Sequence, residues 1–412
     1  MNSVATDGSL VSPGETPLDR FRALVLADAP LQETLRACHD RHRFIALVVE
    51  TARECGFELD ADGLERSLRR PLPGIGDPTA DVGDAETPLP RPGWLPIRAF
   101  WRDGELYAHW SYFGEEQLRE PFFEGDVQRA LGRPFNQLFR HVTPIERLAD
   151  WPPAKAGPPP SGLIFHMSRC GSTLVTQMLA ALDQNIVISE ANPVDAVVQA
   201  RHVRPDLTAE EQARWLRWMV SALVAPRAGG RYAFIKLDCW HSLSLPLFRL
   251  AFPDVPWVFL YRDPVEVLVS QRTMPGSQMI PGLLGPDLTT LGLGYDPARP
   301  EDYYARVLAN ICGPALRHYS SGRALLINYR QLPAALWTAI LPHFGVAVSE
   351  SDRAAMAAAA RYDAKAPSFE FSGDSEAKQK AATAATRAAA AEWLGDFYTR
   401  LEALRRADAR SA

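Results

Sequence analysis

The sequence predicts an α/β fold in which a parallel sheet is flanked by helices and is preceded by a small helical domain and a small α+β segment. Three observations support this expectation. From about residue 161 onward, short apolar runs alternate with helix-length stretches, as in parallel strands that helices cover on both faces. Two proline- and glycine-rich stretches, 71–93 and 151–162, divide the chain and are typical of linkers. The 412 residues also exceed what a single hydrophobic core usually reaches.

Composition restricts the class of protein. The 44 basic and 49 acidic side chains give a net charge of −5, which argues against nucleic acid or an anionic membrane as the main partner. The five cysteines are too few and too scattered for a disulfide scaffold, which favours a reducing compartment. No apolar run approaches the ~18–20 residues that span a bilayer, and the first fifteen residues carry no export signal. We therefore expect a soluble, cytoplasmic protein without a membrane span.

Residues 17–70 are expected to form the small helical domain. Their apolar side chains recur at spacings of three and four, as in Phe21, Leu24 and Val25, which is the period of an amphipathic helix. The segment resembles the leader-peptide domain named after nitrogen-fixation gene clusters, and this resemblance implies recognition by peptide-modifying enzymes. A helical module for packing or for oligomerisation is the alternative, so a homodimer stays open.

Residues 94–150 are expected to form the small α+β segment. Aromatic and apolar residues alternate with polar ones around Asp103-Gly104, a dipeptide that favours a tight hairpin turn. Apolar residues at helical spacing follow from Val127 onward. His109 stands between aromatic residues, and we expect it to be a packed strand residue, with a ligand role as the less favoured alternative.

The long C-terminal segment, 161–405, carries the parallel sheet. Strands are expected at 163–165, 232–235, 257–260 and 325–327, where short apolar runs occur. In sheets of this kind, ligands bind beyond the carboxyl ends of the strands. The residues that directly follow each strand are therefore the first candidates for a functional site.

The strand at 163–165 leads through the loop HMSRCGST, residues 166–173, into a helix. Backbone N–H groups and the positive end of the helix dipole bind an anion at such a turn. The loop matches the pattern G-x-x-x-x-G-K-[ST] only in part, because His166 replaces the first glycine and Ser172 replaces the lysine. A strand-to-helix turn with an N-cap serine is the alternative. The residues expected to bind the anion are Arg169, Cys170, Gly171, Ser172 and Thr173.

A second anion-binding pair follows the strand at 257–260. Arg262 comes directly after this strand, and Ser270 lies about two helical turns further on, so that both can bind one phosphate. The motifs R-C-G-S-T and R-D-P-x-x-x-x-x-S resemble the paired 5′-phosphosulfate and 3′-phosphate motifs of the sulfotransferase family. The resemblance implies a P-loop-type, sulfotransferase-like domain over 161–405 with 3′-phosphoadenosine 5′-phosphosulfate as the sulfuryl donor.

The resemblance also implies roles for single residues. Lys236, at the end of one strand, would lie with Arg169 beside the transferring group, and Tyr329 would lie near the adenine. A core tyrosine at a strand end is the alternative for Tyr329. Leu174 replaces the tryptophan of the family's small-molecule branch, which leaves the wall against the adenine less defined. In the C-terminal tail, the loop before Lys378 and Lys380 resembles a segment of the family that folds over the 3′-phosphate.

A proton acceptor completes the expected catalytic set. A further short strand is expected at 185–189, and it should bring Glu190 to the edge of the sheet that holds the anion-binding loop. The resemblance to the tyrosyl-protein branch implies that Glu190 takes the proton of the acceptor. His241 is the alternative, because the small-molecule branch uses a histidine shortly after the strand that ends in lysine. Here His241 follows Lys236 by five residues, whereas that branch has a spacing of two.

The sequence thus predicts a sulfotransferase that moves a sulfuryl group from 3′-phosphoadenosine 5′-phosphosulfate to a hydroxyl or amine and releases 3′,5′-adenosine bisphosphate. A catalytically inactive nucleotide-binding scaffold is one alternative. An ATP-dependent phosphotransferase is disfavoured, because Ser172 stands at the lysine position. Neither H-E-x-x-H nor a Cys/His cluster occurs, so no metal is expected. The acceptor is expected to be a small molecule or a peptide, and the sequence leaves its identity open.

Overall fold

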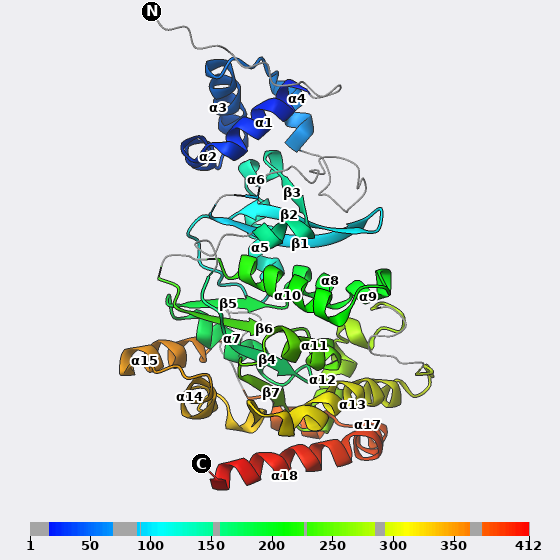
Figure 1. Ribbon diagram of the computed structural model, residues 1–412. Helices are drawn as coiled ribbons and strands as arrows, with labels where there is room; N and C mark the ends of the chain where they lie inside the picture. The colour runs from blue at the N-terminus through cyan, green and yellow to red at the C-terminus, as the bar shows by residue number, and fades with distance from the viewer. Residues whose placement is uncertain are drawn as a thin grey trace, which may run out of the picture.

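The computed structural model describes residues 16–68, 89–90, 92–150, 157–225, 229–284, 293–362 and 373–411. Its elements lie in successive layers, from the N-terminal helices in blue to the C-terminal helix in red (Figure 1). Most of the two predicted linkers lies outside the described residues. The division into domains at 17–70, 94–150 and 161–405 stays a prediction.

The N-terminal segment is helical, as predicted. Phe21 and Phe44 are fully buried, and both pack against Phe139 of the next segment, with ring centroids 6.2 and 6.5 Å apart. Trp94 donates a hydrogen bond from Nε1 to Gln32 Oε1 at 3.0 Å across the same boundary. These helices therefore cover an aromatic face of the middle segment. They are α1 (Pro17–Ala27), α2 (Ala29–Arg36), α3 (Arg41–Glu54) and α4 (Ala61–Leu68).

The middle segment contains a three-stranded antiparallel sheet in the order β1-β2-β3. The predicted hairpin turn is present: Arg102 pairs with Glu105, and Asp103 and Gly104 have φ of 50° and 80°, as the tight hairpin turn requires. His109 is fully buried on β2, and burial lowers its pKa to about 3. The elements are β1 (Trp94–Arg102), β2 (Glu105–Tyr112), α5 (Phe123–Leu131), α6 (Pro134–Leu138), β3 (His141–Pro144) and η1 (Ile145–Asp150).

The C-terminal segment contains a five-stranded sheet in the order β5-β6-β4-β7-β8, with every pair of neighbours parallel. Nearly every residue of its strands is buried, which explains their continuous apolar character. The predicted parallel sheet is therefore confirmed, and β4 lies at its centre between β6 and β7. The strands are β4 (Pro160–His166), β5 (Asn185–Ser189), β6 (Tyr232–Lys236), β7 (Trp257–Tyr261) and β8 (Ala324–Asn328).

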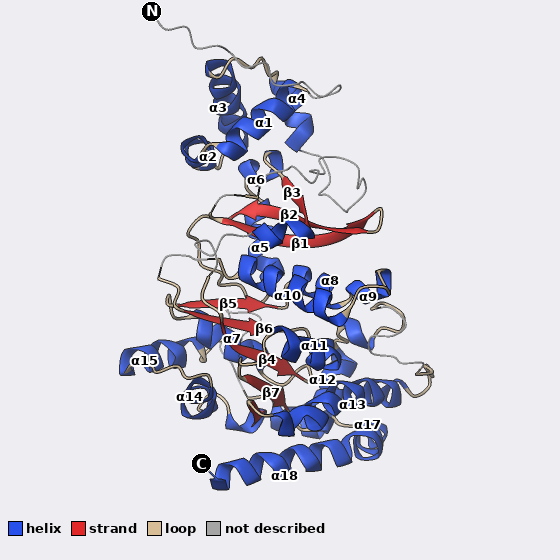
Figure 2. Cartoon of the chain, viewed as in Figure 1, coloured by secondary structure: helices blue, strands red, loops and turns tan. Residues whose placement is uncertain are grey.

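Helices cover this sheet, and Figure 2 shows them in blue around the red strands. Helices α8 and α10 also contact β1, so the small sheet packs on helices of the large one. The helices are α7 (Ser172–Ala180), α8 (Asn192–Val198), α9 (Ala200–Val203), α10 (Ala209–Leu223), α11 (Leu245–Ala251), α12 (Pro264–Thr273), α13 (Pro300–His318), α14 (Leu341–His343), α15 (Glu350–Ala359), α16 (Ser375–Ala381), α17 (Ala384–Ala389) and α18 (Gly395–Ser411).

Short 3-10 and π turns complete the segment: η3 (Cys239–Ser244), η4 (Ser277–Met279), η5 (Tyr319–Ser321), η6 (Tyr329–Gln331), η7 (Leu336–Ile340) and η8 (Ala390–Leu394). Among the described residues, no helix combines the length and the apolar character that crossing a bilayer requires.

Candidate functional site

A cavity of about 460 Å³ lies where β4, β6 and β7 reach their carboxyl ends. Loops that are far apart in the sequence meet there, because neighbouring parallel strands end at the same edge of the sheet. All but one of the residues expected to form the site line this cavity. They are Arg169, Cys170, Gly171, Ser172, Thr173, Glu190, Arg262, Ser270 and Tyr329.

The anion-binding loop is tightly held between β4 and α7. Gly171 has a φ of 87°, and a Cβ atom there would lie 2.8 Å from side-chain atoms of Tyr329 and Leu332. A glycine is therefore needed both for the backbone conformation and for the close approach. Ser168 Oγ accepts hydrogen bonds from Gln271 Nε2 and Gln278 Nε2 at 3.0 and 3.1 Å. The first N–H groups of α7, which have no intrahelical partner, follow directly after this loop.

Two side chains of the loop differ in character. Arg169 is half-buried and donates from a terminal guanidinium nitrogen to the carbonyl of Met274 at 2.8 Å, and burial lowers its pKa. Cys170 is buried, lies 3.2 Å from the carbonyl of Leu260, and burial raises its pKa to about 11. At neutral pH the thiol is therefore neutral, and Cys170 is unsuited to act as a nucleophile.

Lys236, the remaining candidate, is buried at the end of β6 and pairs with Glu190. Its Nζ lies 2.7 Å from Glu190 Oε1, 3.3 Å from Thr173 Oγ1 and 4.5 Å from the ring centre of Phe122. The ammonium group thus links the acidic residue after β5 to the anion-binding loop. Burial favours the neutral acid, but Lys236 and His166 outweigh burial and hold the pKa of Glu190 well below its usual range.

The backbone of Glu190 is strained. Its φ is 54°, a left-handed conformation that a side chain disfavours, and its N–H donates to the carbonyl of Lys236 at 2.9 Å. Conformations of this kind raise the free energy by roughly 1–3 kcal/mol and occur preferentially at functional sites. In this conformation the carboxylate lines the cavity and contacts Lys236.

Arg262, at the end of β7, is only 4% exposed and has acidic partners on two sides. Its Nε lies 2.6 Å from Glu266 Oε2, and a terminal nitrogen lies 2.5 Å from Asp374 Oδ1. The guanidinium also lies over the ring of Tyr329, at 3.9 Å from its centre. Asp374 Oδ2 in turn pairs with Lys378 Nζ at 2.6 Å. The carboxylate of Asp374 therefore occupies a position that suits an anionic oxygen.

Of the two tail lysines, the structure brings only one to the cavity. Lys378 lines it, whereas Lys380 is exposed and pairs with Glu376 at 2.7 Å. Sequence reasoning missed the partners of Arg262. Glu266 had a local signal, the i,i+4 spacing on α12. Asp374 is 112 residues from Arg262 and had none.

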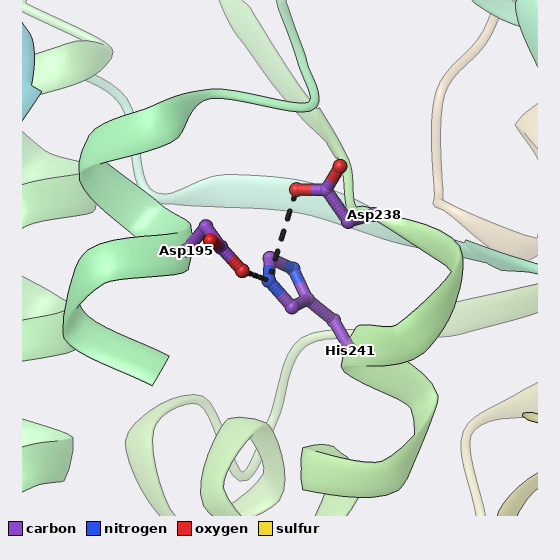
Figure 3. Close-up of side chains that lie close together, drawn as sticks. All are labelled: Asp195, Asp238 and His241. Atoms are coloured by element: carbon purple, nitrogen blue, oxygen red, sulfur yellow. Dashed lines mark hydrogen bonds and ion pairs between the residues drawn. The ribbon is translucent and has the colours of Figure 1, made fainter. Parts of the chain in front are cut away.

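Beside the cavity, Asp195, Asp238 and His241 lie close together (Figure 3). His241 Nε2 lies 2.8 Å from Asp195 Oδ1 and 3.7 Å from Asp238 Oδ2. Asp195 Oδ1 also accepts a hydrogen bond from Trp240 Nε1 at 2.8 Å. The three side chains offer ligand atoms that are close enough together to hold a cation. However, Asp195 Oδ1 already accepts hydrogen bonds from two N–H groups, so we interpret the cluster as a hydrogen-bonded network.

In this network, Asp238 lines the cavity and His241 is buried behind it. Burial raises the pKa of Asp238 to about 7. Burial opposes the charged form of His241, but the hydrogen bond to Asp195 and the negative charges of Asp238, Asp195 and Glu190 together outweigh burial and raise the pKa of His241. The sequence analysis did not identify Asp238 as a site residue. A signal was available, because Asp238 follows the end of β6 by two residues, and residues after strand ends are candidates for a functional site.

No family model matches the chain, and no curated protein does, so the leader-peptide resemblance of residues 17–70 finds no support there. The solved structures that are similar over more than half of the chain include three sulfotransferases or sulfotransferase domains. The sulfotransferase STF9 from Mycobacterium avium is 14% identical over 61% of this chain and 79% of its own, with a TM-score of 0.34.

The other two solved structures are similarly distant. The sulfotransferase domain from the curacin biosynthetic pathway is 15% identical over 57% of this chain and 98% of its own, with a TM-score of 0.36. The sulfotransferase domain from the Synechococcus PCC 7002 olefin synthase is 16% identical over 60% of this chain and 95% of its own, with a TM-score of 0.34. The chain thus has a distant structural resemblance to bacterial sulfotransferase domains.

Proposed function

We propose that the chain is a sulfotransferase that moves a sulfuryl group from 3′-phosphoadenosine 5′-phosphosulfate to a hydroxyl or amine of a small molecule or peptide. One observation carries the proposal. Two groups suited to anions, the loop 168–173 and the pair Arg262 and Ser270, line a single cavity at the ends of adjacent strands. A donor with phosphate groups at its two ends requires this kind of paired site.

The residues of the loop would stabilise the charge that develops during transfer. As the bond between sulfur and the bridging oxygen breaks, negative charge grows on the 5′-phosphate. Arg169 and the N–H groups at the start of α7, together with the hydroxyls of Ser172 and Thr173, are available to meet this charge. Lys236 would support Thr173 from behind, through the 3.3 Å contact between its Nζ and Oγ1.

The other side of the donor would bind near Arg262. This guanidinium would contact the 3′-phosphate after Asp374 moves away, and Ser270 would add a hydroxyl donor. Tyr329 lies against Arg262, at the border between the two anion-binding groups, where an aromatic face can also contact the adenine. Arginine, hydroxyls and backbone N–H groups would hold the phosphates without a metal.

Two alternative functions of the same cavity can be distinguished from a sulfotransferase by experiment. An ATP-dependent phosphotransferase is disfavoured, because Ser172 replaces the lysine that contacts the β- and γ-phosphates. A scaffold that binds the nucleotide without transfer would use the same cavity. The leader-like role of residues 17–70 stays a separate proposal.

Titration calorimetry with 3′,5′-adenosine bisphosphate tests the binding half of the proposal. We expect binding in the presence of a chelator and no comparable binding of Mg-ATP. A preference for Mg-ATP would contradict the proposal and favour the phosphotransferase. Incubation with radiolabelled donor then separates the enzyme from the scaffold, because only the enzyme releases or transfers labelled sulfate.

A further inference from the structure

Two carboxylates line the cavity next to the anion-binding loop, at the ends of adjacent strands. Glu190 follows β5, and Asp238 follows β6. Transfer to a hydroxyl requires a group that accepts the proton, and such a group works best when its pKa lies near the pH of the reaction. The surroundings of the two carboxylates differ, and therefore so does the ability of each carboxylate to accept a proton.

Glu190 is held as a carboxylate by its partners. Its Oε1 lies 2.7 Å from Lys236 Nζ and 3.4 Å from His166 Nε2. The ring of His166 carries its hydrogen on Nε2, since Nδ1 accepts a hydrogen bond from Ser168 N at 3.1 Å. The ion pair with the buried ammonium makes Glu190 a weak proton acceptor, because protonation would leave Lys236 without its counter-charge.

Asp238 has a different environment. Its side chain is 10% exposed and lines the cavity, and among the described residues its carboxylate accepts no hydrogen bond. The closest cationic group is His241 Nε2, at 3.7 Å. Burial raises its pKa to about 7. The charges of Glu190 and Asp195 act in the same direction, whereas those of His241 and Lys236 oppose it. Asp238 can therefore both accept and release a proton near neutral pH.

The residues behind Asp238 are firmly positioned. His241 Nε2 donates to Asp195 Oδ1, and Asp195 also accepts hydrogen bonds from Trp240 Nε1 and from Gln199 Nε2 at 2.8 and 2.5 Å. Asp195 thereby fixes the ring of His241 so that its Nε2 edge also faces Asp238. Asp238 therefore has a cationic neighbour at 3.7 Å, which is a longer and weaker ion pair than the one of 2.7 Å between Glu190 and Lys236.

We propose that Asp238 is the residue that takes the proton of the acceptor, with His241 and Asp195 as positioning residues; this inference rests on the proposed function. The acceptor oxygen forms a bond to sulfur while its O–H bond breaks, and the proton passes to an oxygen of Asp238. The bond from sulfur to the bridging oxygen breaks, and its electron pair leaves with the bisphosphate. Asp238 returns the proton to solvent after the product leaves.

The test compares Asp238→Asn with Glu190→Gln in the full-length chain. The assays are hydrolysis of the donor, in which water is the acceptor, and transfer to phenol and to 4-nitrophenol. We expect Asp238→Asn to bind 3′,5′-adenosine bisphosphate like the parent and to lower hydrolysis and transfer to phenol by ~10²–10⁴-fold. The rate of transfer to 4-nitrophenol should fall far less in Asp238→Asn at a pH where this acceptor is already ionised, because an ionised acceptor needs no base.

The pH profile supplies a second readout. The rate of the parent should rise as Asp238 loses its proton near pH 7 and then level off, and Asp238→Asn should lose this step. His241→Asn should move the step to higher pH, because His241 is the cation closest to Asp238. A merely structural role of these residues would lower the rate without moving the step.

Each other outcome overturns the inference in a recognisable way. Loss of turnover in Glu190→Gln, with Asp238→Asn active, would assign the proton acceptor to Glu190. Loss of the parent's activity in a chelator, with recovery on adding Mn²⁺ or Zn²⁺, would make Asp195, Asp238 and His241 a metal site. A parent that binds no bisphosphate and releases no sulfate would refute the proposed function, and the inference with it.

Discussion

Replacing Asp374 by Asn should strengthen nucleotide binding, although it removes a residue that lines the cavity. Asp374 Oδ1 lies 2.5 Å from Arg262, so a 3′-phosphate must displace it before the guanidinium can bind the ligand. A charge-assisted hydrogen bond contributes ~1.5–3 kcal/mol. Because the Asp374 side chain is 41% exposed, solvent screening reduces this contribution to roughly 1 kcal/mol. Since 1.4 kcal/mol corresponds to tenfold, Asp374→Asn should tighten binding by about fivefold.

Titration calorimetry with 3′,5′-adenosine bisphosphate at low salt measures this change. Glu376→Gln is the matched control, because Glu376 lies in the first turn of α16, directly after the N-cap residue Asp374, is 83% exposed and pairs with Lys380 outside the cavity. The control should bind like the parent. If Asp374→Asn binds the bisphosphate no better than the parent, the carboxylate does not compete with the ligand for Arg262. Weaker binding would mean that Asp374 helps to hold the ligand, which would refute the reasoning.

Three further predictions concern the same sheet edge and its covering segments. Arg262→Ala should weaken bisphosphate binding ten- to hundredfold in calorimetry, whereas the control Arg272→Ala, on the helix α12 that follows Arg262 but outside the cavity, should not. Lys236→Met should lower the free energy of unfolding by ~3–5 kcal/mol in urea titrations at pH 7, because it removes the ammonium that balances the mostly buried charge of Glu190. The lowered pKa of Glu190 means that this stabilisation is present above about pH 4.3 and is lost on further acidification, so the difference between Lys236→Met and the parent should shrink in acid. A chain beginning at Thr87 should still bind the bisphosphate, because every residue that lines the cavity lies beyond it, but should melt at a lower temperature, because it uncovers the aromatic face under α1 and α3. Unaltered melting, or loss of binding, would contradict the respective part of that expectation.

The sheet and the anion-binding loop could be predicted because their signals are local. Short apolar runs predicted all five strands of the sheet, and the order of strand, glycine loop and helix identified residues 166–173 as the anion-binding loop. Ligands bind at the carboxyl ends of parallel strands, and this rule predicts that Glu190 and Arg262 share one edge of the sheet. Both residues do line one cavity at that edge, as the rule requires.

The electrostatics of the site could not be predicted, because they depend on contacts between distant residues. Spacing alone does not reveal that Lys236 is buried against Glu190, or that Asp374 pairs with Arg262. The expected roles of Glu190 and His241 depended on their positions relative to strand ends. Their protonation depends on which groups surround them in three dimensions, and this includes Asp238, which had no motif of its own.

The strand order separates the residues expected to bind the donor from those expected to contact the acceptor. The anion-binding groups stand on the central strand β4 and on β7, whereas Glu190 and Asp238 stand on β5 and β6, on the opposite side of β4. Phe122, from the middle segment, reaches the cavity on this same side, over Lys236. Substitutions around β5, β6 and Phe122 should therefore change the specificity for the acceptor without weakening the binding of the donor. If the proposed function holds, a mutant library restricted to the cavity residues around β5, β6 and Phe122 is the most direct way to alter acceptor specificity.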